Sequence, residues 1–218
     1  MVSSAHDEWL ALGSHWHAAF DEAWESYRAG DMGIGAVLVD PDTDSVVSTG
    51  RNRVNGASPG PGILAGNFMA HAEMNALGSM TSFKADGLHL YTTLEPCLMC
   101  AATSIFLHVD TVHFAVRDEF FDGVGDLWKQ HEYTSRYQPE LTGPLTGKVA
   151  AFARVLPLSI NAATYPNARA MFIAERDVPE IAALAKRIAA NEFGTLNTRA
   201  TTVASVFDEL WAELPAAS

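Results

Sequence analysis

Apolar residues recur every three or four positions near the N-terminus and give way to short continuous apolar runs further along the chain. The helical spacing covers residues 4–28 and predicts one amphipathic helix there. Apolar runs at 34–40 and 45–50 flank the turn sequence PDTD, so they predict two strands joined by a hairpin. The residues that define the first helix are Trp9, Leu12, Trp16, Phe20 and Tyr27.

Strands and helices alternate beyond a Gly- and Pro-rich loop. An Ala-, Met- and Leu-rich segment predicts a helix that opens near His71, and further strands are expected at 88–94 and 111–116. Further helices are expected over 97–108, near 122–131 and over 147–156. Such alternation predicts an α/β fold with three layers, in which helices cover both faces of one sheet.

The composition changes near residue 158. Residues 1–157 carry the alternating strands and helices, whereas the segments at 178–194 and 201–214 have the apolar spacing of two amphipathic helices. We therefore expect a main domain over 1–157 and a helical C-terminal extension over 158–218. Three roles remain open for this extension: it could cap the core, form a dimer surface or close over a substrate.

Composition and charge favour a soluble protein that binds small molecules. In a chain of 218 residues, 48% are hydrophobic and only 18% are charged, so a packed core can form. The formal net charge of -12 opposes close approach to phosphate backbones and anionic lipid. The N-terminus has acidic residues where an export signal needs basic and apolar ones, and the longest apolar runs are too short to cross a bilayer. We expect a cytoplasmic protein without membrane contact.

One imidazole and two thiols have the spacing of a metal site. His71 precedes Glu73 by two residues, and Cys97 and Cys100 stand three apart at the expected start of a helix, directly after Pro96. One His and two Cys are three ligands of the kind that zinc prefers, and they leave a fourth position open for water. A buried pair of small residues or a redox motif are the alternatives for the cysteines, but neither gives His71 and Glu73 a role.

Charge accounting assigns a different role to Glu73. Two thiolates and a neutral imidazole already balance the charge of Zn²⁺, so a fourth anionic ligand would weaken the acidity of the bound water. Glu73 is therefore predicted to be the catalytic proton carrier, which takes a proton from this water and delivers it to the group that leaves. Such a site can replace an amine on an electron-poor ring carbon by oxygen.

The order His-x-Glu followed by Pro-Cys-x-x-Cys resembles the signature of zinc deaminases. The segments GAVLVD, GRNR, AHAEMNAL, LYTTLEPCLMCAATSI and VHFAVRD are similar to the cytidine deaminase-like superfamily, in particular to its tRNA adenosine deaminase and guanine deaminase branch. The resemblance implies a five-stranded mixed sheet between helices, with the strand after the Cys helix parallel to the one before it. It also implies Zn²⁺ on His71, Cys97 and Cys100, with Glu73 as proton shuttle.

The same resemblance suggests where the substrate binds. Asn52 is expected to hydrogen-bond the ring or sugar, although a turn residue that closes the second strand is an equal alternative. The carboxylate of Asp118 could accept hydrogen bonds from a purine or a ribose, or belong to an acidic loop that caps the next helix. The residues expected to contact substrate are Asn52, Ala72, Glu95, Pro96 and Asp118.

The sequence therefore predicts a zinc-dependent hydrolase that acts on the C–N bond of a free nucleobase or nucleoside, preferably a purine, and releases ammonia. A tRNA wobble-adenosine deaminase is the first alternative, although the acidic charge disfavours nucleic acid as a partner. A cytosine- or cytidine-type deaminase and a non-catalytic zinc-binding relative are further alternatives. The resemblance also implies a homodimer.

Overall fold

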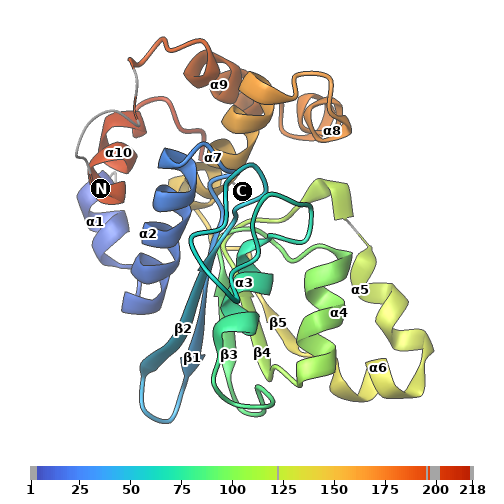
Figure 1. Ribbon diagram of the computed structural model, residues 1–218. Helices are drawn as coiled ribbons and strands as arrows, with labels where there is room; N and C mark the ends of the chain where they lie inside the picture. The colour runs from blue at the N-terminus through green and yellow to red at the C-terminus, as the bar shows by residue number, and fades with distance from the viewer. Residues whose placement is uncertain (1–3, 122, 195, 197–201, 217–218) are drawn as a thin grey trace.

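A computed structural model of the chain describes residues 4–121, 123–194, 196 and 202–216 (Figure 1). Its centre is a five-stranded mixed sheet with the strand order β2-β1-β3-β4-β5. β1 is antiparallel to both β2 and β3, whereas β3, β4 and β5 run parallel to one another. The mixed sheet and the parallel strand after the Cys helix are thus confirmed. The strands are β1 (Gly35–Asp40), β2 (Ser45–Arg51), β3 (His89–Thr92), β4 (Thr111–Phe114) and β5 (Glu140–Thr142).

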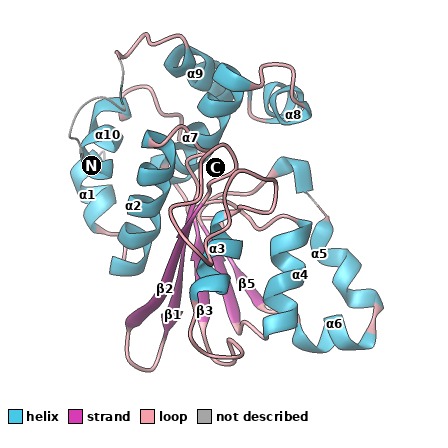
Figure 2. Cartoon of the chain, viewed as in Figure 1, coloured by secondary structure: helices cyan, strands magenta, loops and turns pink. Residues whose placement is uncertain are grey.

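Helices cover both faces of this sheet, which confirms the three-layer architecture (Figure 2). Successive side chains of β1 point to opposite faces, and the buried clusters follow that alternation. Leu38 packs in a cluster with Ala76 of α3 (Ala72–Ser79), whereas Val37 packs with Ala19 of α2 (Ser14–Arg28). α4 (Leu98–Leu107) packs beside α3. The sheet is therefore buried on both sides where it carries the helices of the metal motif.

Two expected elements differ from the structure. The single helix expected over 4–28 is two helices, α1 (Ala5–Leu10) and α2, because the chain leaves the helical conformation at Leu12 and re-enters with Gly13 as the N-cap of α2. β5 lies in a stretch that sequence reasoning treats as loop, because all three of its residues are exposed and give no apolar signal.

Several short helices link the last two strands. They follow β4 and lead into the edge strand β5, and they include most of the region near 122–131 where the sequence predicts a helix. In chain order they are η1 (Glu119–Phe121), α5 (Val124–Leu127), η2 (Trp128–Gln130) and α6 (Glu132–Tyr137).

The C-terminal part packs as helices against the core. α7 (Lys148–Thr164) runs without a break through residues 157 and 158, so the expected domain boundary falls inside one helix. α8 (Arg169–Asp177) was not predicted, while α9 (Pro179–Ala189) and α10 (Val203–Leu210) match the two expected amphipathic helices. α9 packs on α7, and Phe207 of α10 lies 5.5 Å from Trp9 of α1 between ring centroids. Among the described helices, none is both long and apolar enough to cross a membrane.

Candidate metal centre and active site

Two helix N-termini bring the predicted metal ligands together. His71 is the N-cap of α3 and Cys97 is the N-cap of α4, while Cys100 lies in the first turn of α4. α3 and α4 pack against each other, and their N-termini lie side by side, since the ligand atoms of these three residues are all within 4.8 Å of one another. His71 thus sits at the start of its helix, as the sequence requires if His71 and Glu73 are to act on one centre.

The three ligand atoms form a triangle of the size that zinc needs. Nδ1 of His71 lies 3.5 Å from each Sγ of Cys97 and Cys100, and the two sulfurs are 3.6 Å apart. Tetrahedral zinc with ordinary bond lengths places two sulfurs about 3.8 Å apart and a sulfur about 3.5 Å from a nitrogen. The two thiols and the imidazole therefore fit Zn²⁺ in both chemistry and spacing.

The electrostatics of the centre favour a thiolate beside a buried carboxyl group. Hydrogen bonds from Cys100 and from His71 lower the pKa of Cys97 to about 4. Glu73 is only 3% exposed, and this burial raises its pKa to about 7. Glu73 lines the same cavity as His71 and Cys97, so it adjoins the metal ligands and is outside the ligand triangle.

This cavity, of about 340 Å³, is the candidate substrate pocket. Of the residues expected to contact substrate, Asn52, Glu95 and Asp118 line it. The side chain of Ala72 does not line it, because it is fully buried in the core under β1. Pro96 lines a separate cavity behind α4. A substrate contact from Ala72 would have to come from its backbone.

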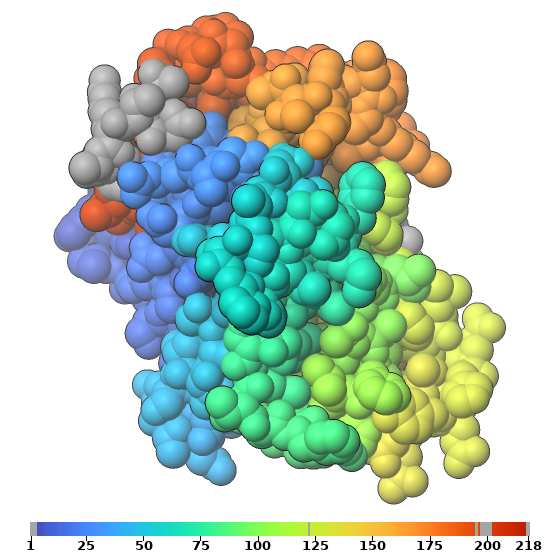
Figure 3. Space-filling view, viewed as in Figure 1, coloured from blue at the N-terminus to red at the C-terminus, as the bar shows by residue number. Residues whose placement is uncertain are grey.

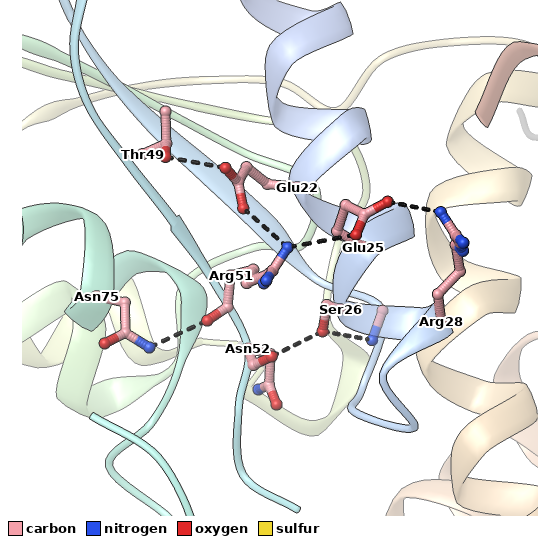
Figure 4. Close-up of polar contacts among 9 residues, drawn as sticks. Glu22, Glu25, Ser26, Arg28, Thr49, Arg51, Asn52 and Asn75 are labelled. Carbon is pink, nitrogen blue, oxygen red and sulfur yellow. Dashed lines mark hydrogen bonds and ion pairs between the residues drawn. The ribbon is translucent and has the colours of Figure 1, made fainter. Parts of the chain in front are cut away.

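Asn52 fits both interpretations of its role. Its Oδ1 accepts a hydrogen bond from the N–H of Val54 at 3.1 Å, which is the turn interaction. It nevertheless lines the pocket, and its carbonyl oxygen accepts from Oγ of Ser26 at 2.8 Å (Figure 4). The backbone of Asn52 is thereby fixed to α2 while its side chain borders the metal centre.

The end of β2 is fastened to the helices on both sides. Arg51 lies between Glu22 and Glu25 of α2, with N···O distances of 4.0 and 3.7 Å (Figure 4). On the other side, the side-chain N–H of Asn75 of α3 donates to the carbonyl oxygen of Arg51 at 3.0 Å. Asn75 also accepts from the N–H of Leu64 at 2.9 Å, so it ties the long loop to the helix that begins at the metal centre.

Asp118 is held in the pocket wall by several hydrogen bonds. Its N–H donates to Oε2 of Glu95 at 3.2 Å, and its Oδ1 accepts from the N–H of Phe120 at 3.1 Å. The second of these bonds is the expected capping interaction. Oδ1 also accepts from Arg154 at 3.4 Å, a buried residue of α7 that sequence reasoning missed. The signal for Arg154 was its charge in the otherwise apolar run VAAFARVLPL.

The remaining walls come from the long loop and the C-terminal helices. Phe68 of the loop, Asn161 of α7 and Ala170 of α8 line the pocket, and none was predicted. Tyr165, which follows α7, donates its hydroxyl to Oδ1 of Asn55 in the loop at 2.8 Å. The space-filling view shows the teal loop directly beside these orange helices (Figure 3). Trp128 lines the separate cavity that also contains Pro96.

Comparisons with known proteins agree with this geometry. Residues 12–116 match the family model of the cytidine and deoxycytidylate deaminase zinc-binding region. A tRNA-specific adenosine deaminase 2 from Xenopus tropicalis is 30% identical over 145 residues, which cover 57% of this chain and 79% of the relative. The Xenopus laevis protein of the same name is 32% identical over 121 residues, or 51% of this chain and 63% of that one.

Solved structures of related enzymes are also similar. One comes from a study of A-to-I editing by tRNA:A34 deaminases, with 26% identity, a TM-score of 0.48, and coverage of 59% of this chain and 95% of that chain. Another is guanine deaminase from Nitrosomonas europaea, with 23% identity, a TM-score of 0.46, and coverage of 67% of this chain and 84% of that chain. From the family model and the curated relatives, the chain belongs to the cytidine deaminase-like superfamily of zinc-binding deaminases, near its tRNA adenosine deaminase branch.

Proposed function

We propose that this protein is a zinc-dependent hydrolytic deaminase of a free nucleobase or nucleoside, with a purine as the preferred ring. The observation that carries the proposal is the triangle of His71, Cys97 and Cys100 beside the buried Glu73, at one wall of a pocket that opens to solvent. A metal with three protein ligands and an open position is the arrangement of catalytic rather than structural zinc.

The residues of this chain have separate tasks in such a reaction. Zinc, when bound, supplies a Lewis acid that makes water a stronger nucleophile at neutral pH. Glu73 takes one proton from the attacking water and delivers it to a ring nitrogen, and it then carries the remaining proton of the added hydroxyl to the amine, which leaves as ammonia. The carbon–nitrogen bond breaks and a carbon–oxygen bond takes its place. Asn52 and Asp118 orient the ring from the pocket wall.

The size and the walls of the pocket support a small substrate. A volume of about 340 Å³ lies at the lower end of the range for small-molecule sites, roughly 300–1,000 Å³. At the border of the pocket, the hydrogen bond from Tyr165 to Asn55 joins the C-terminal helices to the long loop. Delivery of a flipped tRNA base needs a phosphate-binding groove, which the net charge of -12 opposes.

Ammonia release from a panel of substrates tests this function. The zinc-loaded protein is incubated with guanine, guanosine, adenosine, cytosine and cytidine, and turnover of a purine is expected. Glu73→Gln should keep zinc and fold but lose activity by about 10²–10⁴-fold, because only the proton transfer is removed. The proposal fails if the intact protein with stoichiometric zinc deaminates none of the panel.

Deamination of a tRNA wobble adenosine is the second candidate. It is favoured by the names of the curated relatives, several of which are tRNA-specific adenosine deaminases. Inosine formation in tRNA, together with tRNA binding that weakens steeply with salt, would establish it. Absence of tRNA retention at low salt would remove it.

We also propose that the protein acts as a homodimer in the cytoplasm. α4 carries an outward apolar stripe of Leu98, Ala102 and Phe106, in which Leu98 is 46% and Phe106 is 70% exposed. Exposed apolar stripes of this kind mark contact surfaces. Light scattering should give the mass of a dimer for the wild type and of a monomer for Phe106→Glu. A reducing compartment suits two cysteines that must remain thiolates.

A further inference from the structure

Helix α7 places one buried cation next to the metal centre. Arg154 is 3% exposed, and its neighbours Val155 and Leu156 belong to the apolar core. The guanidinium nevertheless lines the pocket that contains His71 and Glu73. An unpaired charge in such a place is strongly destabilising, so the role of Arg154 depends on its anionic partners.

Two carboxylates share this guanidinium. Glu119 accepts from Nε at 3.0 Å and from Nη2 at 2.7 Å, and Asp118 accepts from Nη2 at 3.4 Å. The two partners face different spaces. Asp118 lines the pocket of the metal centre, whereas Glu119 lines a separate groove beside α9. Arg154 therefore connects one carboxylate inside the pocket to one outside it.

The bonds to Asp118 determine which of its oxygens can meet a ligand. Among the described residues, both the N–H of Phe120 and the guanidinium of Arg154 bond to Oδ1. Oδ2 is therefore the oxygen available to a molecule in the pocket. A carboxylate oxygen accepts hydrogen bonds from N–H and O–H groups only, and charge-assisted bonds of this kind are strong.

We propose that Arg154 is a positioning residue that holds Asp118 so that Oδ2 accepts a hydrogen bond from an N–H or O–H donor of the substrate. The inference rests on the proposed function, and it deepens that function by naming the chemistry that the pocket selects. The donor is a ring N–H or a ribose hydroxyl. Stability alone does not explain the cluster, because buried ion pairs add little stability relative to apolar residues of similar size.

A double-mutant cycle tests this role. Binding of guanine and of guanosine is measured by calorimetry on the zinc-loaded chain, in a Glu73→Gln background that prevents turnover, for Arg154→Met, Asp118→Asn and the double variant. Each single change should raise the Kd of at least one of these two probes at least tenfold, and the double variant should match Asp118→Asn alone, because Arg154 acts through Asp118. Arg154→Lys should recover part of the affinity, since it restores the charge without the planar fork.

Glu119→Gln is the matched control. It removes the shorter of the two ion pairs but leaves the bond between Arg154 and Asp118 in place, so it should lower stability and keep the Kd within twofold. 1-Methylguanine, 9-methylguanine and guanosine then identify the donor. If a ring N–H pairs with Asp118, the guanine that is methylated at that nitrogen should have the same Kd for the parent and for Arg154→Met. If a ribose hydroxyl does, the difference appears with guanosine alone.

The outcomes separate the inference from the proposed function. Additive effects in the cycle, unchanged Kd values for both guanine and guanosine in folded Arg154→Met, or equal losses in Glu119→Gln would mean that Arg154 only supports the fold. Lack of binding of any purine probe to the parent would also overturn the inference. Tight purine binding without turnover by the chain with Glu73 intact would instead contradict the proposed function alone.

Discussion

Replacement of Gly50 by Ala should damage the metal centre from the far side of α3. Gly50 lies on β2, and a Cβ built there would be 2.2 Å from the backbone nitrogen of Ala76 and 2.3 Å from the carbonyl oxygen of Ala72. Ordinary contacts at this position begin at 3.4 Å, so α3 must move away by about 1.2 Å. Both close atoms belong to the helix backbone, and rotation of a side chain cannot relieve them.

The size of this shift sets the expected effect. The helix that must move begins at His71 and carries Glu73, whereas Cys97 and Cys100 lie on α4. A displacement of about 1 Å at a reacting group costs about 10²-fold in rate, and overpacking a core costs roughly 1–3 kcal/mol. Gly50→Ala should therefore bind zinc more weakly, unfold at lower urea concentration and lose at least 10²-fold of its activity.

Gly78→Ala provides the control on the same helix. Gly78 also belongs to α3, but a Cβ there meets no atom within 4 Å. This change should stabilise the protein by about 0.5–1 kcal/mol, because alanine favours the helix, and leave zinc content unchanged. Urea unfolding and metal analysis compare the two variants. If Gly50→Ala keeps full zinc and the same stability as the wild type, the close packing of β2 on α3 does not position the centre.

Three further changes test the centre, the sheet and the pocket wall. Cys97→Ala should lose stoichiometric zinc, and a chelator should then lower the melting temperature of the wild type but not of this variant. Burial lowers the pKa of His113 to about 4, with smaller contributions from His89 and His15, so the unfolded chain takes up the proton first as pH falls below about 6.5. The free energy of unfolding should therefore fall by roughly 1–2 kcal/mol between pH 7 and 4.5, a range that allows for the partial exposure of this side chain. The fall should be smaller in His113→Phe, and urea titrations at both pH values measure it. Ala170→Trp should raise the KM for a nucleoside more than for its base, whereas Phe172→Trp, on the exposed part of α8, should change neither.

The sequence was sufficient for the metal centre because its signals are local. His71 and Cys97 both cap helices, and Pro96 with an apolar run marks one of these helix starts. One helix break and two whole elements were missed instead. The break before Gly13 lies within one continuous amphipathic spacing, β5 has no buried residue, and α8 buries only Met171 and Ala174.

The pocket walls could not be predicted for a different reason. Asn52 and Asp118 follow strands that end at the same edge of the sheet, and both residues line the pocket, so a family resemblance could indicate them. Arg154 belongs to the helix expected over 147–156, but its side chain reaches the pocket only through the packing of α7 on the core. Ala170 reaches the same pocket because α8 folds back toward Phe120, where the guanidinium of Arg169 lies 5.5 Å from the ring centroid. Their positions depend on long-range packing that no single segment encodes.

This division of the pocket has a consequence for substrate choice. The groups proposed to do the chemistry come from the starts of α3 and α4, whereas other lining residues of the pocket come from α7 and α8, namely Arg154, Pro157, Asn161 and Ala170. Changes in α7 and α8 can therefore alter the shape and hydrogen bonding of the pocket without moving the metal ligands. Arg154 differs from the other lining residues of these helices, because its ion pair holds Asp118, a carboxylate that also lines the pocket. Substitutions of the pocket-lining residues of α7 and α8 should thus change KM and leave zinc affinity intact.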